Sequence, residues 1–365
     1  MAEVVEQEWG VDLISSWNKH GWFTMANRVG AKMAKLIGAK AHEVMVADST
    51  SVNLFKVVSA ALQLRPHRRI IVSERANFPT DLYMLEGLIR QLGSRHELRL
   101  MDHDDDISAS ITDAVAVVVL THVSYRTGRM LDMAHCTQLA HQAGALVVWD
   151  LAHSAGAVPV ELNEAGADFA VGCGYKYLNG GPGAPAFLFV AEALQDSCEQ
   201  PLSGWFGHAQ PFAFEHTYTP ASGIQRFQCG TPPILSLVAL EVGVDLMLEA
   251  CQQELRQKSV GLCDTFVALV QQECSSWAFQ QVSPNSASKR GSQVCLAHPE
   301  GYAIIQALIA QGVVGDFRAP DILRFGFAPL YISYVDVWRA VQQLKAVMRE
   351  RLWDREEYRQ QSAVT

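Results

Sequence analysis

The sequence predicts an α/β protein: a mostly parallel sheet covered by helices, followed by a smaller C-terminal α+β domain. Short apolar runs alternate with amphipathic stretches as far as Cys198. Continuous apolar strands separated by helices are typical of a parallel sheet buried on both faces. The alternation stops in a segment rich in Gly, Pro and aromatic residues, and it resumes in the tail. Hydrophobic residues make up 49% of the 365 residues, which excludes a disordered chain.

The individual elements follow from periodicity and from start and stop signals. Apolar residues at i, i+3 and i+4 spacing predict helices over 26–37 and 51–64, the second preceded by the helix-start signal Asp48–Ser51. The following alternation predicts strands at 69–73, 96–101, 114–120, 145–150, 168–172 and 186–190, with helices at 79–92 and 132–143. The remainder predicts helices at 234–250, 251–274, 299–312 and 335–351, with strands at 293–297 and 322–327. We therefore expect an N-terminal arm (1–25), a large domain (26–250) and a small domain (251–365).

Charge and cysteine content narrow the class of protein. A formal net charge of −9 disfavours a nucleic-acid partner. The longest aliphatic run, Ala114–Leu120, is too short to cross a bilayer, and the acidic start lacks the pattern of a secretory signal. The eight cysteines form no C-x-x-C pair and no zinc-ligand spacing, which indicates reduced thiols and no metal site. These features predict a cytoplasmic protein.

The segment from Val148 to Gly183 carries the strongest chemical signal. Asp150 ends one apolar strand, and Lys176 follows the next strand, between Tyr175 and Tyr177 and before a Gly-rich turn. In a parallel sheet both side chains would lie at the carboxyl edge, where ligands bind. The lysine there could form an imine with an aldehyde cofactor, and the aspartate could hold the protonated ring nitrogen of pyridoxal phosphate (PLP). Each residue alone is compatible with a structural role, but together they predict a PLP site.

Five further residues each have two interpretations. Ser49 and Thr50 could bind a phosphate at a helix N-terminus or simply cap that helix. Phe78 could stack on a planar ring or staple a helix start. His153, three residues after Asp150, could line the same cleft or be structural. Arg324 could grip a substrate carboxylate or form a structural ion pair.

Five segments resemble the kynureninase family, particularly its bacterial form. These are Ala76–Tyr83, Trp149–Gly183, Leu202–His208, Phe227–Ile234 and Arg324–Tyr331. They are long, specific and in the family's order over essentially the whole chain. The resemblance implies the aspartate-aminotransferase-type fold (PLP-dependent transferase fold, type I), a homodimer, and PLP-dependent hydrolysis of L-kynurenine to anthranilate and L-alanine.

The resemblance also implies a role for each matching residue. Lys176 would be the Schiff-base lysine, Asp150 the pyridinium partner and Tyr175 a proton relay. The rest of the cofactor shell would consist of Ser49, Thr50, Phe78, Asp81, His153, Trp205 and Thr231, with Trp205 and Thr231 reaching the phosphate across the dimer interface. Substrate binding would involve Arg324 at the α-carboxylate and Trp17 at the aromatic ring.

One departure from the family pattern leaves an alternative open. Members usually begin with several tens of additional residues carrying a G-N-S-L-G-type motif, whereas this chain opens directly at the helix before Ser16-Trp17-Asn18. A shortened noncatalytic homologue would bind PLP without turnover. A cysteine desulfurase of the same fold would instead need a reactive cysteine on a mobile loop near Lys176, and Cys173 is expected to be packed in a strand.

Overall fold

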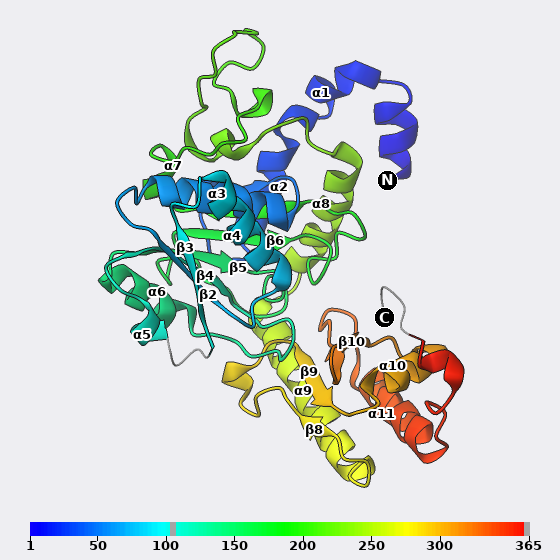
Figure 1. Cartoon of the computed structure of the whole chain (residues 1–365). Helices are drawn as coiled ribbons and strands as arrows, with labels where there is room; N and C mark the ends of the chain where they lie inside the picture. The colour runs from blue at the N-terminus through cyan, green and yellow to red at the C-terminus, as the bar shows by residue number, and fades with distance from the viewer. Residues whose placement is uncertain (103–106, 361–365) are drawn as a thin grey trace. The chain divides into compact units, whose positions relative to one another are not determined.

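The computed structural model describes residues 1–102 and 107–360, and these form two compact units (Figure 1). The first unit comprises Met1–His122 and Leu131–Glu249. The second comprises Val123–Met130 and the chain from Ala250 onward. A short excursion of the chain, Val123–Met130, therefore belongs with the C-terminal unit although it lies in the middle of the first unit's sequence.

The first unit is built on a sheet of seven strands within the described residues, in the order β1-β7-β6-β5-β4-β2-β3. The strands are β1 (Val44–Val46), β2 (Ile70–Glu74), β3 (Glu97–Met101), β4 (Val115–Thr121), β5 (Leu146–Asp150), β6 (Phe169–Cys173) and β7 (Ala186–Val190). Strands β2 to β6 pair in parallel, and β7 is antiparallel to β6. Because β1 is in turn antiparallel to β7, it points in the same direction as β2 to β6. The predicted mostly parallel sheet is confirmed.

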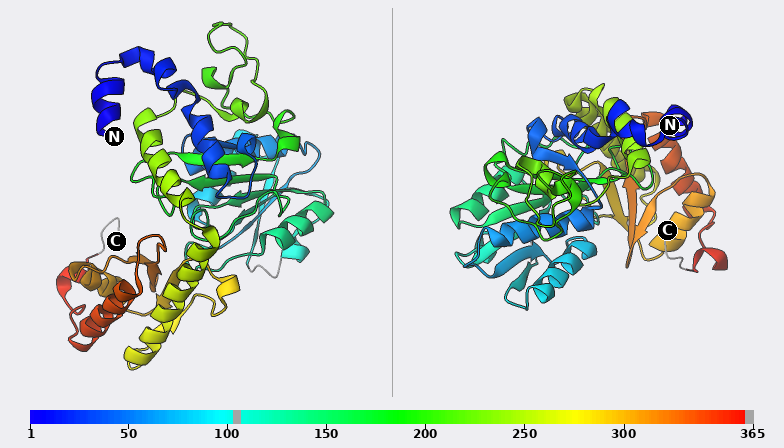
Figure 2. Two further views of the ribbon diagram at one scale, coloured as in Figure 1. Left: turned by 180° about the vertical axis from the view of Figure 1, so that it is seen from behind. Right: turned by 90° about the horizontal axis from the view of Figure 1, so that it is seen from above.

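Helices bury the sheet, which explains why its central strands consist of unbroken apolar runs. Every residue of β4, β5, β6 and β7 is buried. Helix α3 packs along β4 to β7 and against α4, while α2 packs against β1 and α8, as Figure 2 shows. The helices of this unit are α1 (Ser16–Lys19), α2 (Met25–Ala34), α3 (Thr50–Gln63), α4 (Pro79–Gln91), α5 (Ile107–Ser110), α6 (Met133–Gln142), α7 (Glu192–Gln195) and α8 (Ile234–Leu248).

Two features of the first unit were not expected from the sequence. Strand β1 has only three residues, which are too few for a periodic pattern, and it forms because it pairs with β7. The N-terminal segment contains a π-helix, Val4–Trp9, held by a hydrogen bond from Trp22 Nε1 to Glu8 Oε2 (2.7 Å). The long segment between β7 and α8 is irregular, as expected, and contains only α7 and the 3-10 turns Trp205–Gly207 and Gly223–Phe227 among its regular elements.

The second unit has its own antiparallel sheet in the order β10-β11-β9-β8 and its own core. Its elements are α9 (Gln252–Glu273), β8 (Gln280–Gln281), β9 (Gln293–Ala297), α10 (Gly301–Ala310), β10 (Asp316–Arg318), β11 (Ile322–Gly326) and α11 (Tyr334–Arg349). Its core centres on Phe266, whose ring lies 4.8 Å from that of Phe325 and 5.4 Å from that of Phe327. This is the smaller α+β domain that the sequence predicts. Among the described residues, no helix is both long enough and apolar enough to cross a membrane.

Candidate active site

A cavity of about 790 Å³ opens at the carboxyl edge of the large sheet. Residues that follow the carboxyl ends of four strands line it: those after β1, β2, β5 and β6, together with the residues that lead into β7. The residues singled out from the sequence that line this cavity are Ser49, Thr50, Phe78, Asp81, Asp150, His153, Tyr175, Lys176 and Thr231. Parallel strand direction explains this gathering, since it brings the ends of distant segments to one edge.

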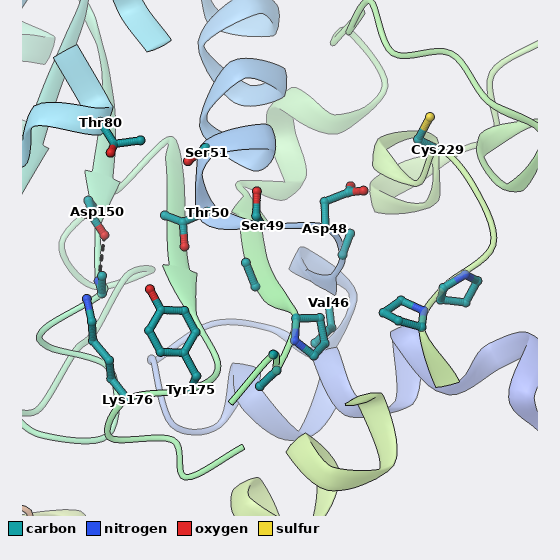
Figure 3. A pocket seen from close by; sticks show the side chains of 18 of the residues that line it. Val46, Asp48, Ser49, Thr50, Ser51, Thr80, Asp150, Tyr175, Lys176 and Cys229 are labelled. Atoms are coloured by element: carbon teal, nitrogen blue, oxygen red, sulfur yellow. Dashed lines mark hydrogen bonds between the residues drawn. The ribbon is translucent and has the colours of Figure 1, made fainter. Parts of the chain in front are cut away.

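Lys176 and Asp150 lie on the same side of the cavity, with the Tyr175 ring beside them (Figure 3). Lys176 Nζ is 5.6 Å from the centroid of the Tyr175 ring. The chain turns sharply after the lysine, where Asn179, Gly181 and Gly183 have positive φ angles of 59°, 76° and 79°. Glycine adopts this backbone region without strain, so the G-G-P-G run returns the chain to β7. The Gly-rich segment is therefore the tight turn expected from the sequence.

Two buried carboxyls face the interior of the cavity. Asp150 is 3% exposed and accepts a hydrogen bond at Oδ1 from the Ala152 N–H (2.7 Å; Figure 3), and Asp81 is 2% exposed. Burial raises the pKa of both carboxyls, and the adjacent Asp150 charge raises that of Asp81 further. Lys176 opposes the rise at Asp150 because its positive charge favours the ionised carboxylate. The pKa of Asp81 is thus held well above its ordinary value by burial and by the Asp150 charge, and Lys176 offsets part of the rise at both carboxyls.

The N-terminus of α3 forms another part of the cavity wall. Ser49 is the N-cap of α3, and its Oγ accepts a hydrogen bond from the Val52 N–H at 3.3 Å. Ser49 and Thr50 also line the cavity, so capping the helix and facing a ligand are compatible here. The free N–H groups and dipole of a helix N-terminus favour an anion.

An aromatic face and a histidine complete the cavity wall. Phe78 is the N-cap residue of α4 and remains 40% exposed, so its ring faces the cavity instead of packing into the core. His153 is 8% exposed and lines the cavity near Asp150. Thr231 is exposed at the cavity wall that precedes α8.

Trp17 and Trp205 do not line this cavity. They meet at Phe206, whose ring centroid is 5.9 Å from that of Trp17 and 4.4 Å from that of Trp205. Phe23 and Phe212 extend this aromatic cluster, which joins the N-terminal segment to the irregular segment before α8. Their predicted contacts with substrate and cofactor remain proposals.

Arg324, in the second unit, is engaged by an ion pair. Its Nε donates to Asp316 Oδ1 at 2.7 Å and its Nη2 to Oδ2 at 2.5 Å, while Nη1 donates to the Tyr125 carbonyl at 2.7 Å. Arg324 therefore forms the structural ion pair that was one of its two interpretations. Its predicted binding of a substrate carboxylate remains a proposal.

Several cavity residues were missed by reasoning from the sequence. They are Asp48, Ser51 and Thr80, and the residues Gln228 and Cys229 of the wall before α8. Each lies in a segment with a visible signal: Asp48 and Ser51 belong to the helix-start signal, Thr80 lies in Ala76–Tyr83, and the two wall residues lie in Phe227–Ile234. Neighbouring residues in those segments have side chains with more distinctive chemistry.

The donors and acceptors of the cavity fit PLP. Asp81 Oδ2 is buried and has no hydrogen-bond partner among the described residues, and the charge of Asp150 acts on Asp81 from beside it. A protonated ring nitrogen is the kind of donor that such a pair accommodates. The α3 N-terminus suits a phosphate, the exposed face of Phe78 suits a planar ring, and the Lys176 amine suits an aldehyde.

The cysteine desulfurase alternative finds no support at Cys173. This residue ends β6, is 3% exposed, and burial raises the pKa of its thiol, which keeps the sulfur protonated and unreactive. Within residues 1–102 and 107–360, no group of three or more His, Cys, Asp or Glu side chains is arranged to hold a metal ion.

Comparisons with known proteins agree with the chemistry of the cavity. Residues 24–197 match a family model described as Cys/Met metabolism PLP-dependent enzyme, and residues 255–344 match one described as kynureninase C-terminal domain. The kynureninase of Pseudomonas fluorescens is 51% identical over 99% of this chain and 88% of its own length. The kynureninase of Burkholderia mallei (strain SAVP1) is 52% identical over 100% of this chain and 88% of its own.

Solved structures with similar folds include a cysteine desulfurase from Thermococcus onnurineus, with a TM-score of 0.77 and 21% identity over 91% of this chain and 85% of that one. A cystine C–S lyase gives a TM-score of 0.74 and 18% identity over 92% of this chain and 87% of that one. At these identities the likeness concerns the fold, and it confirms the aminotransferase-type architecture of PLP-dependent enzymes. The identity of about half of all residues to curated kynureninases over nearly the whole chain is decisive for the family: the chain belongs to the kynureninases, which are PLP-dependent enzymes.

Proposed function

We propose that this protein hydrolyses L-kynurenine at its Cβ–Cγ bond, giving anthranilate and L-alanine. The observation that carries the proposal is the 51% identity with a curated kynureninase over 99% of the chain. The cavity supports it, because Lys176 and Asp150 meet there with the donors that PLP needs. No observation favours the shortened noncatalytic homologue.

Each part of PLP would have a partner in the cavity. The α3 N-terminus, with Ser49 and Thr50, would hold the phosphate, and the face of Phe78 would support the ring. His153 and Tyr175 would complete the part of the shell that this chain supplies to its own cofactor. When bound, PLP supplies an electron sink next to the α-carbon of the substrate.

The side chains of this chain would move and hold the protons of the reaction. Lys176 would hold the cofactor aldehyde at rest and, once displaced by the substrate amine, remove the α-proton with Nζ. Asp150 would stay ionised and hold a proton on the ring nitrogen, with Asp81 as the protonated partner beside it. Tyr175 would donate its phenolic proton, since burial raises its pKa and keeps the hydroxyl protonated at neutral pH. Water would then add to the side-chain ketone, and the Cβ–Cγ bond would break with its electron pair staying on Cβ, which releases anthranilate. Protons delivered to Cβ and to the α-carbon would then give L-alanine.

The substrate contacts and the assembly belong to the same proposal. Arg324 would bind the substrate α-carboxylate, which would compete with Asp316 for the guanidinium fork. Trp17 would contact the aromatic ring. We also propose a cytoplasmic homodimer in which Trp205 and Thr231 reach the phosphate of the partner's cofactor.

Reduction and mass mapping test the proposed site directly. Borohydride treatment of the PLP-loaded protein, followed by peptide mass analysis, should place the pyridoxyl group on Lys176. Anthranilate fluorescence, followed with L-kynurenine as substrate, should rise with time. A label on another lysine would refute the proposed role of Lys176. Label on Lys176 without anthranilate would favour the noncatalytic homologue.

A further inference from the structure

Lys56 is a fully buried lysine on α3, and neither the fold nor the proposed reaction accounts for its charge. Its side chain is 0% exposed, and a buried ammonium is costly unless it is paired. Lys56 Nζ donates to Asp48 Oδ2 at 2.5 Å and to the Phe227 carbonyl at 2.6 Å. Both partners adjoin the cavity, although Lys56 itself does not line it.

The two partners belong to different walls of the cavity. Asp48 immediately precedes Ser49 and Thr50, has a positive φ of 45°, and lies between Ser49 and Cys229 in Figure 3. Phe227 immediately precedes the wall Gln228–Thr231. Through these two hydrogen bonds, the Lys56 ammonium group links the start of α3 to the segment that leads into Gln228–Thr231.

The Asp48–Lys56 ion pair also affects the electrostatics of the cavity. Asp48, Asp81 and Asp150 line the cavity, whereas Lys176 is the only lysine or arginine among the lining residues that the structure describes. Lys176 is committed to the aldehyde end. A phosphate at the α3 N-terminus would therefore approach the carboxylate of Asp48, and like charges at close range repel. The ammonium of Lys56 is the positive charge placed to cancel that repulsion.

We infer that Lys56 is a positioning residue for the cofactor phosphate: its pairing with Asp48 neutralises a carboxylate at the phosphate end of the cavity. The inference rests on the proposed binding of the phosphate at α3, and it concerns affinity for the phosphate, not the chemical step. Lys56 acts through Asp48 and does not itself touch the cofactor.

The test compares three variants that all remove the Asp48–Lys56 ion pair but leave different charges. Lys56→Met leaves an uncompensated carboxylate, Asp48→Asn leaves an uncompensated ammonium, and the double variant leaves neither. The dissociation constants of PLP and of pyridoxal are measured by absorbance titration of cofactor-free protein prepared from the holoenzyme. Pyridoxal, which lacks the phosphate, is the matched control ligand.

If Lys56 acts by neutralising Asp48, the PLP affinity of the variants should follow the net charge left at positions 48 and 56. Lys56→Met should weaken PLP binding by about tenfold to a hundredfold, Asp48→Asn should bind PLP at least as tightly as the wild type, and the double variant should lie between them. Pyridoxal binding should change by less than about threefold in all three, because it carries no phosphate charge. Added salt should reduce the spread.

Two results would overturn the inference. One is that all three variants weaken PLP binding equally, and the other is that the variants weaken pyridoxal binding as much as PLP binding. Either result would mean that the Asp48–Lys56 interaction only holds the structure together. If Lys56→Met does not fold, Asp48→Asn carries the test alone, and a tenfold loss of PLP affinity there would also overturn it. Failure of the wild type to bind PLP would instead refute the proposed function, so the two failures are distinguishable.

Discussion

The chemistry of the cavity is set at the residue scale by two buried carboxyls whose pKa values are raised. Burial raises the pKa of both Asp81 and Asp150, and Lys176 stabilises the charge of each, but the charge of Asp150 raises the pKa of Asp81 further. Asp150 is therefore the better acceptor of the two for a cation. A protonated ring nitrogen would be held there.

Asp150→Asn should retain PLP but lose most of its activity. The amide preserves the side-chain volume, yet it cannot stabilise a positive charge on the ring nitrogen, so kcat should fall by about 100-fold or more. PLP absorbance and anthranilate release, measured on the same samples, check this. Asp113→Asn, which alters an exposed carboxylate in a turn, is the matched control and should be fully active. Near-normal turnover in folded Asp150→Asn would exclude the role assigned to Asp150.

Asp81→Asn should stabilise the cofactor-free protein at neutral pH. In the unfolded chain Asp81 ionises near its ordinary pKa of 3.8, whereas the folded chain retains the proton to a higher pH. Unfolding therefore releases a proton, and the unfolding free energy of the wild type falls as the pH rises between those two pKa values. Wyman linkage sets the contribution of one such group at about 1.4 kcal/mol per pH unit.

Denaturant unfolding of cofactor-free wild type and Asp81→Asn at a series of pH values measures this difference. The two curves should converge below about pH 4, where Asp81 is protonated in both states, and separate as the pH rises. A variant that is less stable than the wild type at pH 7 would contradict the protonation state assigned to Asp81.

At the scale of secondary-structure elements, the start of α3 combines a stabilising cap with a ligand-binding end. The Ser49 hydroxyl accepts from the Val52 N–H, and Asp48 has a positive φ that turns the chain into the helix. Helix α11 begins in a comparable way, with the Ser333 hydroxyl accepting from the Asp336 N–H at 3.2 Å, but it belongs to the second unit and Ser333 is not one of the residues that line the cavity. The two helices therefore separate the effect of a lost cap from the effect of a lost ligand contact.

Ser49→Ala and Ser333→Ala should both reduce stability, but only Ser49→Ala should weaken PLP binding. Loss of a serine N-cap costs about 1 kcal/mol, because a helix N–H loses its partner. Ser49→Ala also removes a hydroxyl from the proposed phosphate site. Thermal unfolding and PLP titration of the two variants provide the comparison. Equal PLP affinity in both would show that Ser49 acts as a cap alone.

On the scale of the whole molecule, apolar surface is left uncovered on the first unit. Helix α8 carries apolar residues on both its buried and its exposed side: Leu237, Leu240 and Val244 are buried, while Val242 and Leu246 are 62% and 47% exposed. Exposed apolar stripes of this kind mark interaction surfaces in soluble proteins. They support the proposed homodimer, in which a second copy would cover them.

Sedimentation should show a dimer at assay concentration, and glutamates on α8 should dissociate it. Val242→Glu combined with Leu246→Glu would place two charges in the proposed interface, where burial without a partner is strongly unfavourable. Val314→Glu is the matched control, since Val314 is 84% exposed on the second unit. A wild-type monomer with full activity would refute both the dimer and the shared phosphate site.

Local pattern by itself determined the longer helices and strands of this protein. The apolar run at 186–190 and the proline at the start of α4 predict their elements at the observed positions, because burial and helix-start geometry are set by neighbouring residues. Motif and strand order were also enough to bring Asp150 and Lys176 to one edge. The three-residue strand β1 was beyond local pattern, since only its pairing with β7 makes it a strand.

Tertiary structure alone decided the protonation and the partners of the charged groups. Nothing local indicates that Lys56 is buried against Asp48 and Phe227, since Asp48 lies two helical turns away and Phe227 is distant in the sequence. Nor does local sequence show that Arg324 pairs with Asp316, or that Asp81 holds a proton beside Asp150. Burial and charge proximity are properties of the folded arrangement, and they determine which of these groups are charged and what each one binds.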